Sequence, residues 1–162
     1  AQWEMAARGT DGRIYPWGTE APAWAKTRDP KKLDPVMSFD ADRSPFGAFD
    51  MAANAWEWTK DYYDSRYYQL FKSTVPTDPS GPSNRGGSQE LVIRGGSKTW
   101  ALTKREGLRY DKRLPFLGFR CVLAVEGADN GVQAPAATPA PAPAANEAPP
   151  LPGAPVNAPP PF

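Results

Sequence analysis

The sequence contains no histidine and a single cysteine, Cys121. Without histidine, the chain cannot build a Ser-His-Asp triad or a metal site that depends on imidazole ligands. One cysteine forms no internal disulfide and cannot supply a multi-cysteine zinc site, and it does not identify a redox compartment. These absences exclude several common classes of hydrolase and zinc site from this chain.

The sequence also lacks long apolar runs and a strong excess of charge of either sign. No run approaches the roughly 20 apolar residues that a membrane-spanning helix needs. The 162 residues carry a formal net charge of +1, and no run of lysine and arginine alternates with aromatic residues as a nucleic-acid groove would require. We therefore expect no membrane span in this chain and no nucleic-acid partner.

Composition divides the chain into two parts. Residues 128–162 include eleven prolines and eleven alanines but only two charged residues. A segment with so few core-forming side chains is typical of a disordered or extended polyproline-like tail. Residues 1–127 hold all 19 basic and 16 of the 18 acidic residues, a net charge of +3. We expect this first part to be the folded domain.

Local patterns in the first part predict one short helix and two strands. Residues 1–9 form an amphipathic pattern that Gly9 can end. The runs "ELVIRGGS" (90–97) and "FLGFRCVLAV" (116–125) predict strands. Proline-rich and glycine-rich stretches between these elements predict long loops. We expect an α+β domain dominated by loops and held together by its six Trp, six Tyr and seven Phe.

The segment "DMAANAWEWTKDYY" (50–63) places carboxylates and an amide among large aromatic side chains. A buried carboxylate without a partner is strongly unfavourable, so Asp50 and Glu57 need partners elsewhere in the molecule. The pattern leaves two local structures open: one or two helical turns from residue 53, or an aromatic coil fixed by side chains.

Four separated stretches resemble, in order, the signature blocks of the formylglycine-generating enzyme family, also called sulfatase-modifying factors. They are "AQWEMAARG", "GRIYPWG", "SPFGAFDMAANAWEWTKDYY" and "VIRGGS…LGFRCV", and they span most of residues 1–123. The resemblance implies a variant of the C-type-lectin fold with little regular secondary structure. It also implies a longer complete domain, so we expect this chain to be a piece of a longer protein in which the first half of the domain precedes Ala1.

The resemblance implies a structural calcium ion in segment 50–63. The side chains of Asp50 and Glu57 and the backbone carbonyls of Ala53 and Ala55 would be its ligands. Calcium takes six to eight hard oxygen ligands at about 2.3–2.6 Å, and such a mixed set suits it. The alternative is that both carboxylates accept hydrogen bonds from backbone amides or a nearby arginine.

Other residues of the resembling blocks are expected to support the scaffold. Asn54 would form a turn or a hydrogen-bond network rather than bind metal. Arg94, Arg109 and Arg120 resemble family arginines that bridge loops through hydrogen bonds to carboxylates or carbonyls, and we expect structural use of Arg94 and Arg120. A second calcium loop of the family would lie between residues 17 and 46, where "AWAKTRD" lacks the expected asparagine, so we do not expect a second site.

The resemblance also implies where the catalytic chemistry would be, and there the sequence departs from the family. Family members oxidise a substrate cysteine with a copper ion held by two thiolates, and the matching positions are Trp100 and Arg105. Neither binds Cu(I), because indole nitrogen has no free lone pair and guanidinium stays protonated. Cys121 is expected to be a buried, inert thiol. We therefore expect neither copper nor the parent oxidation.

Five residues fall where the parent enzyme receives its peptide: Trp100, Lys104, Arg105, Arg109 and Tyr110. Aromatic and arginine side chains are typical of recognition surfaces, and an ordinary solvated rim is the alternative. We expect a non-catalytic, calcium-stabilised binding or scaffold module for a protein or glycan partner.

Two other functions stay open. One is a working formylglycine-generating oxidoreductase. The other is a structural subunit of a larger assembly, whose proline-rich tail acts as a spacer or docks on an aromatic groove. Calcium dependence and an Ala/Pro tail suit an extracytoplasmic bacterial location, which we expect for this chain.

Overall fold

The computed structural model describes residues 1–20, 32–71, 73–74, 76–77, 79–83, 87–96 and 98–123. The elements of this part, in chain order, are α1 (Gln2–Arg8), β1 (Trp56–Tyr62), the 3-10 helix η1 (Tyr67–Phe71), β2 (Glu90–Arg94), β3 (Glu106–Arg109) and β4 (Leu117–Gly118). The described part is α+β, as predicted, and loops make up most of it. The proline-rich tail predicted for residues 128–162 lies outside it.

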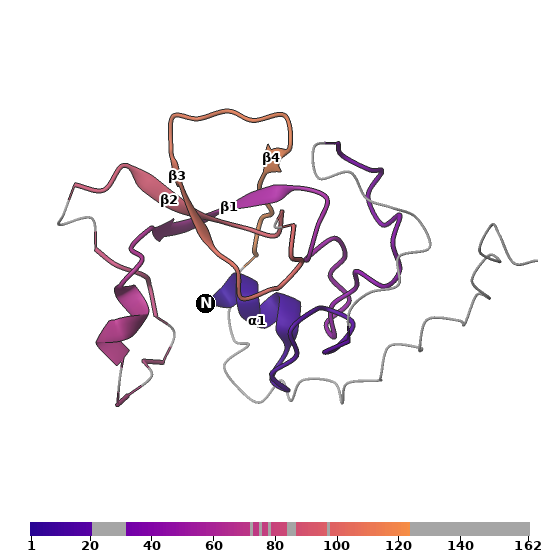
Figure 1. The fold of residues 1–162 in the computed structure, drawn as a ribbon, viewed down its shortest axis with the longest axis horizontal. Coiled ribbons are helices and arrows are strands. Elements are labelled where there is room, and N and C mark those ends of the chain that lie inside the picture. Colours follow the sequence, from indigo (N-terminus) through magenta and orange to yellow (C-terminus); the bar gives the residue numbers. More distant parts are fainter. Residues whose placement is uncertain are drawn as a thin grey trace, which may run out of the picture.

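The strands form one mixed sheet in the order β3-β2-β1-β4. β2 is antiparallel to both β1 and β3, and β4 runs parallel to β1. Helix α1 lies below β1 and β2 in the view of Figure 1 and contacts the face that carries Glu57 and Arg94. These two residues are register partners, so helix and sheet meet at one pair of facing side chains.

Strand β1 corrects the prediction for segment 50–63. The sequence pattern favoured helical turns or a coil, but Trp56–Tyr62 is extended and pairs with β2 on one side and β4 on the other. Its aromatic and threonine side chains have high β-propensity. The pairing partners lie 29 or more residues away, and a local pattern carries no information about them.

Strand β2 confirms the prediction for residues 90–97, although the strand itself ends at Arg94. Val92 and Ile93 are buried within it. Gly95 follows the strand with a φ of +91°, and a Cβ there would lie 3.0 Å from the carbonyl oxygen of Ala55. A side chain at this position would therefore be strained both by its backbone and by its neighbour.

The strand predicted over residues 116–125 is largely wrong within the described chain. Only Leu117–Gly118 is in a strand, because β1 offers a partner at Trp56 and Glu57 alone. Residues 119–123 have no strand structure, and the last two predicted positions lie outside the described part. Cys121, expected to be buried, is exposed there.

The core lies where α1 meets the turn that precedes β1. Ala7, Met51, Ala52 and Leu102 are almost fully buried, with tryptophans packed around them (Trp3, Trp17 and Trp100). Helix α1 confirms the prediction for residues 1–9, and Gly9 ends it with φ +69°. No helix in the described part is long and apolar enough to cross a membrane.

Candidate functional site

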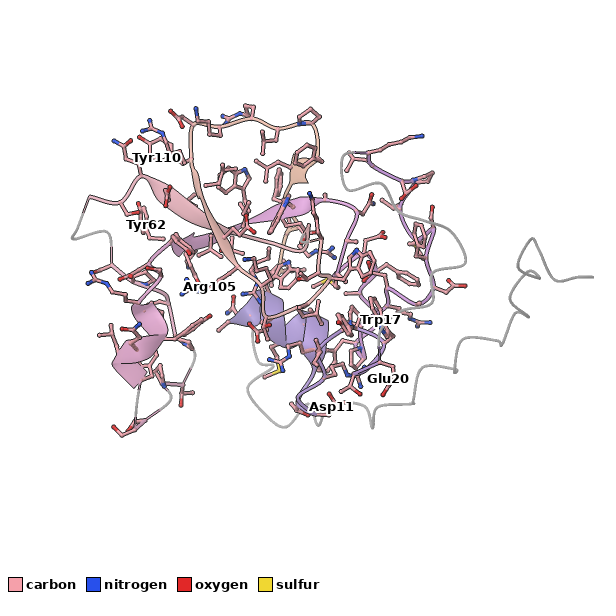
Figure 2. The ribbon with its side chains drawn as sticks, in the orientation of Figure 1. Asp11, Trp17, Glu20, Tyr62, Arg105 and Tyr110 are labelled. Carbon is pink, nitrogen blue, oxygen red and sulfur yellow. The ribbon has the colours of Figure 1, made fainter. Side chains whose placement is uncertain are left out.

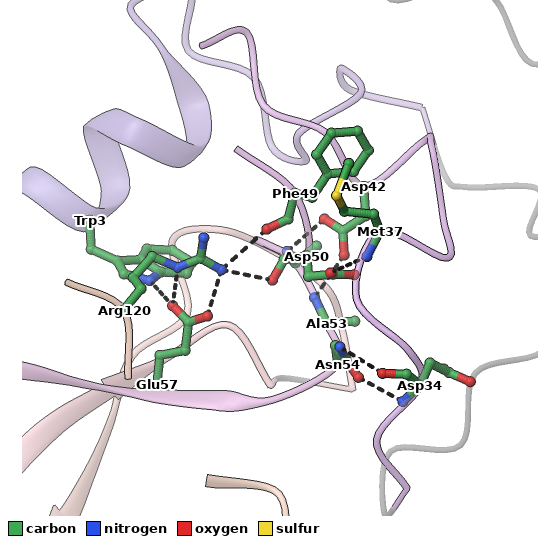
Figure 3. Close-up of polar contacts among 11 residues, drawn as sticks. Trp3, Asp34, Met37, Asp42, Phe49, Asp50, Ala53, Asn54, Glu57 and Arg120 are labelled. Carbon is green, nitrogen blue, oxygen red and sulfur yellow. Dashed lines mark hydrogen bonds and ion pairs between the residues drawn. The ribbon is translucent and has the colours of Figure 1, made fainter. Parts of the chain in front are cut away.

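The carboxylate of Glu57, on β1, accepts three hydrogen bonds from distant parts of the chain. Trp3 Nε1 on α1 and Arg120 Nε donate to Oε2, each at 2.7 Å, and Arg120 Nη2 donates to Oε1 at 2.6 Å. Figure 3 shows the guanidinium and the carboxylate meeting side by side, the bidentate geometry that gives strong charge-assisted bonds. Only 9% of the Glu57 side chain is exposed, so the carboxylate meets its partners inside the protein rather than in solvent.

Arg120 connects this carboxylate to the turn before β1. Its Nη2 also donates to the backbone carbonyls of Phe49 at 3.2 Å and Asp50 at 3.4 Å. Burial acts to lower the pKa of Arg120, but the hydrogen bonds and negative charge of Glu57 outweigh it, so the pKa is raised. The guanidinium therefore stays charged, and the predicted bridging role of Arg120 is confirmed.

The turn before β1 is held by two aspartates. Asp50 has φ +57°, and its Oδ2 accepts a hydrogen bond from the backbone N–H of Met37 at 2.9 Å. The fully buried Asp42 accepts from the backbone N–H groups of Ala52 at 2.8 Å and Ala53 at 3.1 Å. Carboxylates thus satisfy backbone donors that neither helix nor sheet would pair. Sequence reasoning missed Asp42.

Asn54 confirms the expectation of a hydrogen-bonding residue. Its Oδ1 accepts from the backbone N–H of Asp34 at 2.8 Å, and its Nδ2 donates to the carbonyl of the same residue at 3.2 Å (Figure 3). Its φ of +84° is one that asparagine tolerates better than most residues. The side chain therefore fastens the loop around residue 34 to the turn.

The four predicted calcium ligands share this neighbourhood. The carboxylates of Asp50 and Glu57 have protein donors, which corresponds to the alternative left open by the sequence. Hard oxygens alone make up the set, which is the donor type that calcium prefers, but Glu57 already accepts three hydrogen bonds where a carboxylate offers about four lone-pair sites. The described residues include no group of three or more His, Cys, Asp or Glu able to hold a metal. The predicted set differs from such a group, because it has only two carboxylates and its other two ligands are the backbone carbonyls of Ala53 and Ala55.

A second ion pair lies beside the first. Arg94 Nη2, on β2, donates to Glu4 Oε2 on α1 at 2.7 Å and also to the carbonyl of Leu102, and its guanidinium stacks 4.9 Å from the Trp3 ring. Burial alone would raise the pKa of Glu4, but hydrogen bonds and charge from Arg94, and then from Arg8, lower it below its usual value. The predicted bridging role of Arg94 is confirmed.

The five residues of the predicted recognition surface have different environments. Trp100 has φ +55° and packs against the core, so most of its ring is not offered to a partner. Lys104 is exposed, and its Nζ lies 3.6 Å from Oε1 of Glu106. Arg109 is exposed and forms an ion pair with Asp111 at 2.9 Å.

Arg105 joins β3 to the segment that follows β1. Its Nη2 donates to the backbone carbonyl of Asp64 at 2.8 Å. The same guanidinium lies 5.1 Å from the ring centre of Tyr63 and 4.5 Å from that of Tyr68 in η1. We call this arrangement the Arg105 clasp. It engages the Arg105 guanidinium in contacts within the chain, and no sequence pattern predicted it.

Tyr110 is 55% exposed at the far end of β3 from Arg105 (Figure 2). Its neighbour Arg109 is the register partner of Glu90, at the end of the sheet away from Trp100. The structure thus spreads the five residues along β3 and into the core. The exposed side chains available to a partner are Lys104, Arg109 and Tyr110.

Comparison with known proteins agrees with the sequence blocks. The family described as "Sulfatase-modifying factor enzyme 1-like domain" matches residues 1–125. A formylglycine-generating enzyme of Streptomyces coelicolor is 31% identical over 147 residues, covering 75% of this chain and 44% of that protein. The formylglycine-generating enzyme of Bos taurus is 27% identical over 146 residues, covering 75% and 37%.

A relative of another kind is the serine/threonine-protein kinase pkn1 of Chlamydia pneumoniae. It is 33% identical over 97 residues, which cover 59% of this chain and 15% of the kinase. The chain thus spans less than half the length of each of these three relatives. Since the family match covers most of the chain, this protein belongs to the sulfatase-modifying factor enzyme 1-like domain family.

Proposed function

We propose that this chain is a non-catalytic, formylglycine-generating-enzyme-like domain that acts as a binding or scaffold module for a protein or glycan partner. The observation that carries the proposal is the state of the two positions that match the family's copper ligands. Trp100 packs against the core, and Arg105 is held in its clasp. Both side chains support the fold, and neither offers sulfur to Cu(I).

Partner binding would use the exposed part of the former substrate face. Lys104, Arg109 and Tyr110 place two cations and an aromatic ring on and beside β3. Arginine and tyrosine are enriched in recognition surfaces because they combine apolar area with hydrogen-bond donors. A relationship to the C-type-lectin fold would suit such a role, since in that architecture loops form the binding surface. An extracytoplasmic location remains part of this proposal.

A structural calcium ion is part of the proposal. Asp50, Glu57 and the carbonyls of Ala53 and Ala55 would hold it, and it would supply positive charge and fixed coordination to the turn before β1. Arg120 already balances the charge of Glu57, so we expect calcium to add to this ion pair rather than replace it.

The exposed apolar side chains near β4 suggest a further part of the same domain. Phe119, Val122 and Leu123 are 73%, 80% and 86% exposed, and in the described part β4 is paired on one side only. Clustered exposed apolar residues and unpaired strand edges mark places where another segment packs. We propose that the upstream half of the domain covers this edge.

Copper binding tests the non-catalytic role against the alternative that the relatives' names suggest, a formylglycine-generating oxidoreductase. The reduced full chain is titrated with Cu(I) in the presence of a chromogenic Cu(I) chelator. We expect no stoichiometric transfer of copper to the protein, and any weak uptake should disappear in Cys121→Ser. Stoichiometric uptake that survives Cys121→Ser would overturn the proposal.

The partner surface is tested separately with peptide and glycan arrays. A ligand found with the wild-type chain should be lost with Tyr110→Ala. It should be kept with Val36→Ala, a matched truncation of a 78% exposed side chain in another part of the molecule. Equal loss in both variants, or in neither, would exclude this surface.

A further inference from the structure

A shallow hollow of about 400 Å³ lies where β1 ends and β2 begins, and none of the predicted calcium ligands lines it. The walls come from the end of β1, the segment after it, the loop before β2 and the first residue of β2. Its lining residues are Tyr62, Tyr63, Asp64, Ser65, Arg66, Pro82, Ser83, Ser88 and Glu90. The register places Arg109 and Tyr110 at this same end of the sheet (Figure 2). Small-molecule sites typically have volumes of about 300–1,000 Å³.

The absence of a side chain at Gly107 brings two walls of the hollow together. A Cβ at this position of β3 would lie 2.5 Å from the Tyr63 ring and 2.7 Å from Glu90 Oε2. Glycine weakens a strand interior, and it often marks a close approach of other groups. Here it lets the ring and the carboxylate lie next to each other against the strand.

The Arg105 clasp holds one of these walls in place. The guanidinium that lies over Tyr63 also bonds the carbonyl of Asp64, so two consecutive lining residues are fixed by one side chain. A site whose walls are held in position before binding loses less conformational entropy when a ligand binds.

Several polar groups of the lining are left for a ligand. Within the described part of the chain, the Glu90 carboxylate and the Arg66 guanidinium have no hydrogen-bond partner or ion pair. Asp64 accepts one bond, from the backbone N–H of Arg66 to Oδ1 at 2.7 Å. Two hydroxyls, of Ser65 and Ser83, add groups that both donate and accept.

The charges around the hollow are balanced. Asp64 and Glu90 contribute two negative charges, and Arg66 stands at the exposed rim. Arg109 lies opposite Glu90 in the sheet, and Arg105 lies behind Tyr63. Such a lining does not select strongly for a ligand of either charge, but it offers donors and acceptors at close range.

We propose that this hollow binds a neutral carbohydrate unit. Sugar hydroxyls donate and accept hydrogen bonds, as the mixed lining requires, and the apolar C–H face of a sugar ring can pack on a tyrosine ring. The inference deepens the proposed binding role and rests on it, but the residues that line the hollow do not include Tyr110.

The test is an NMR titration of the full chain with the methyl glycosides of glucose, galactose, mannose and N-acetylglucosamine. Argininamide and glutamate serve as charged comparison ligands. We expect at least one glycoside to shift the backbone signals of Ser65, Ser83 and Ser88 with a Kd in the millimolar range, while the charged ligands shift them less. No shift at about 50 mM of any glycoside would overturn the proposal, because a millimolar site would then be nearly saturated.

Variants locate the binding. Glu90→Gln keeps the shape of the side chain and should weaken glycoside binding about fivefold to tenfold, as expected for loss of one charge-assisted hydrogen bond. Tyr62→Ala should weaken it as well. Glu106→Gln, on β3 and outside the hollow, should bind as the wild type does.

Three outcomes contradict the inference. They are equal binding by all variants, equal weakening by Glu106→Gln, and tighter binding of argininamide than of every glycoside. The last result would identify a cation site instead. If the arrays find a ligand that depends on Tyr110 while the hollow binds no glycoside, the proposed function stands and this inference alone fails.

Discussion

Glu57 draws three parts of the chain together through one side chain. Trp3 approaches it from α1, Arg120 approaches from the segment after β4, and the residue itself lies in β1. A buried carboxylate that loses its charge leaves its arginine partner unbalanced, which costs more than the lost bond alone. The energetic importance of this position therefore exceeds that of an exposed ion pair.

Replacing Glu57 by glutamine should lower the free energy of unfolding by about 2–3 kcal/mol, because the amide cannot accept two charge-assisted bonds. Urea denaturation measures the change. The matched control is Asp111→Asn, which removes an exposed ion pair with Arg109 and should leave the free energy of unfolding almost unchanged. Equal costs in the two variants would show that the Glu57 pair adds nothing special.

The same variant tests the calcium proposal in a second way. Added calcium should raise the melting temperature of the wild-type chain and leave that of Glu57→Gln unchanged. The calcium-dependent difference is the informative quantity, since loss of the Arg120 pair lowers stability with or without metal. Identical wild-type melting in calcium and in chelator would count against the ion.

Glu4 makes stability depend on acid pH. Its pKa in the folded protein is below its ordinary value of 4.5, so its contribution is fully present above about pH 4.5 and is lost as the pH falls through the folded pKa. The stability difference between wild type and Glu4→Gln should shrink from about pH 6 to about pH 3, as followed by urea denaturation. A constant difference would show that the charge of Glu4 is unimportant.

Asp11 should not disturb this measurement. Hydrogen bonds from Arg13 hold the pKa of Asp11 at about 2, so it titrates below most of the range. Its side chain is also half exposed, and exposed ion pairs contribute little to stability.

At the residue scale, sequence blocks predicted the roles of Arg94, Arg120 and Asn54 correctly. They did not predict that Trp3 donates to Glu57 or that Asp42 accepts from two backbone amides. These contacts join positions that are 54 and about ten residues apart. Neither partner carries a local pattern that names the other, so only the folded chain reveals them.

At the scale of elements, Gly107 shows how one missing side chain sets the distance between neighbours. Tyr63, just after β1, and Glu90, at the start of β2, both lie against it. In the same sheet, a Cβ added at Gly118 of β4 would have no neighbouring atoms within 4 Å. The two glycines thus form a matched pair that differs in crowding.

Gly107→Ala should destabilise the protein by about 1–3 kcal/mol, because the added methyl group must displace the Tyr63 ring and Glu90. Gly118→Ala should be neutral or slightly stabilising, since alanine restricts the unfolded chain more than glycine does. Thermal and urea unfolding of both variants provide the comparison. Equal effects would mean that the crowding at Gly107 relaxes at little cost.

Element predictions succeeded where the pattern was local. Helix α1 and strand β2 have their amphipathic or apolar run and a glycine beyond their end. Strand β1 was missed because its aromatic-rich sequence suits several local structures, and its pairing with β2 and β4 decided among them. β3 contains a glycine and exposed charged ends, so no strand signal was available.

At the scale of the whole molecule, each outer strand of the sheet, β3 and β4, is paired on one side only in the described part. β4 is short, and the exposed apolar residues that follow it have no cover there. The sequence pattern thus predicts a longer strand over residues 116–125 than the two residues that find a pairing partner in the described part. The upstream half of the domain, if it packs here as proposed, would complete that strand.

The labelling rate of the Cys121 thiol tests whether another segment covers this edge. In the 162-residue chain its thiol is exposed, and it should react with a maleimide at a rate close to that of a small thiol. In a longer form that includes the upstream sequence, labelling should slow at least about tenfold if the new segment covers the edge, as expected for a site that reacts only on local opening. Mass spectrometry after timed quenching measures both rates, and equal rates would contradict the proposed cover.

The Arg105 clasp has a consequence for which substitutions the protein tolerates. Three contacts from one guanidinium anchor the segment after β1, so Arg105→Cys would release that anchor. Trp100 packs against the core, so Trp100→Cys would carry a similar penalty. Installing two thiols at these positions would thus require compensating substitutions first, an epistatic constraint that single steps do not overcome.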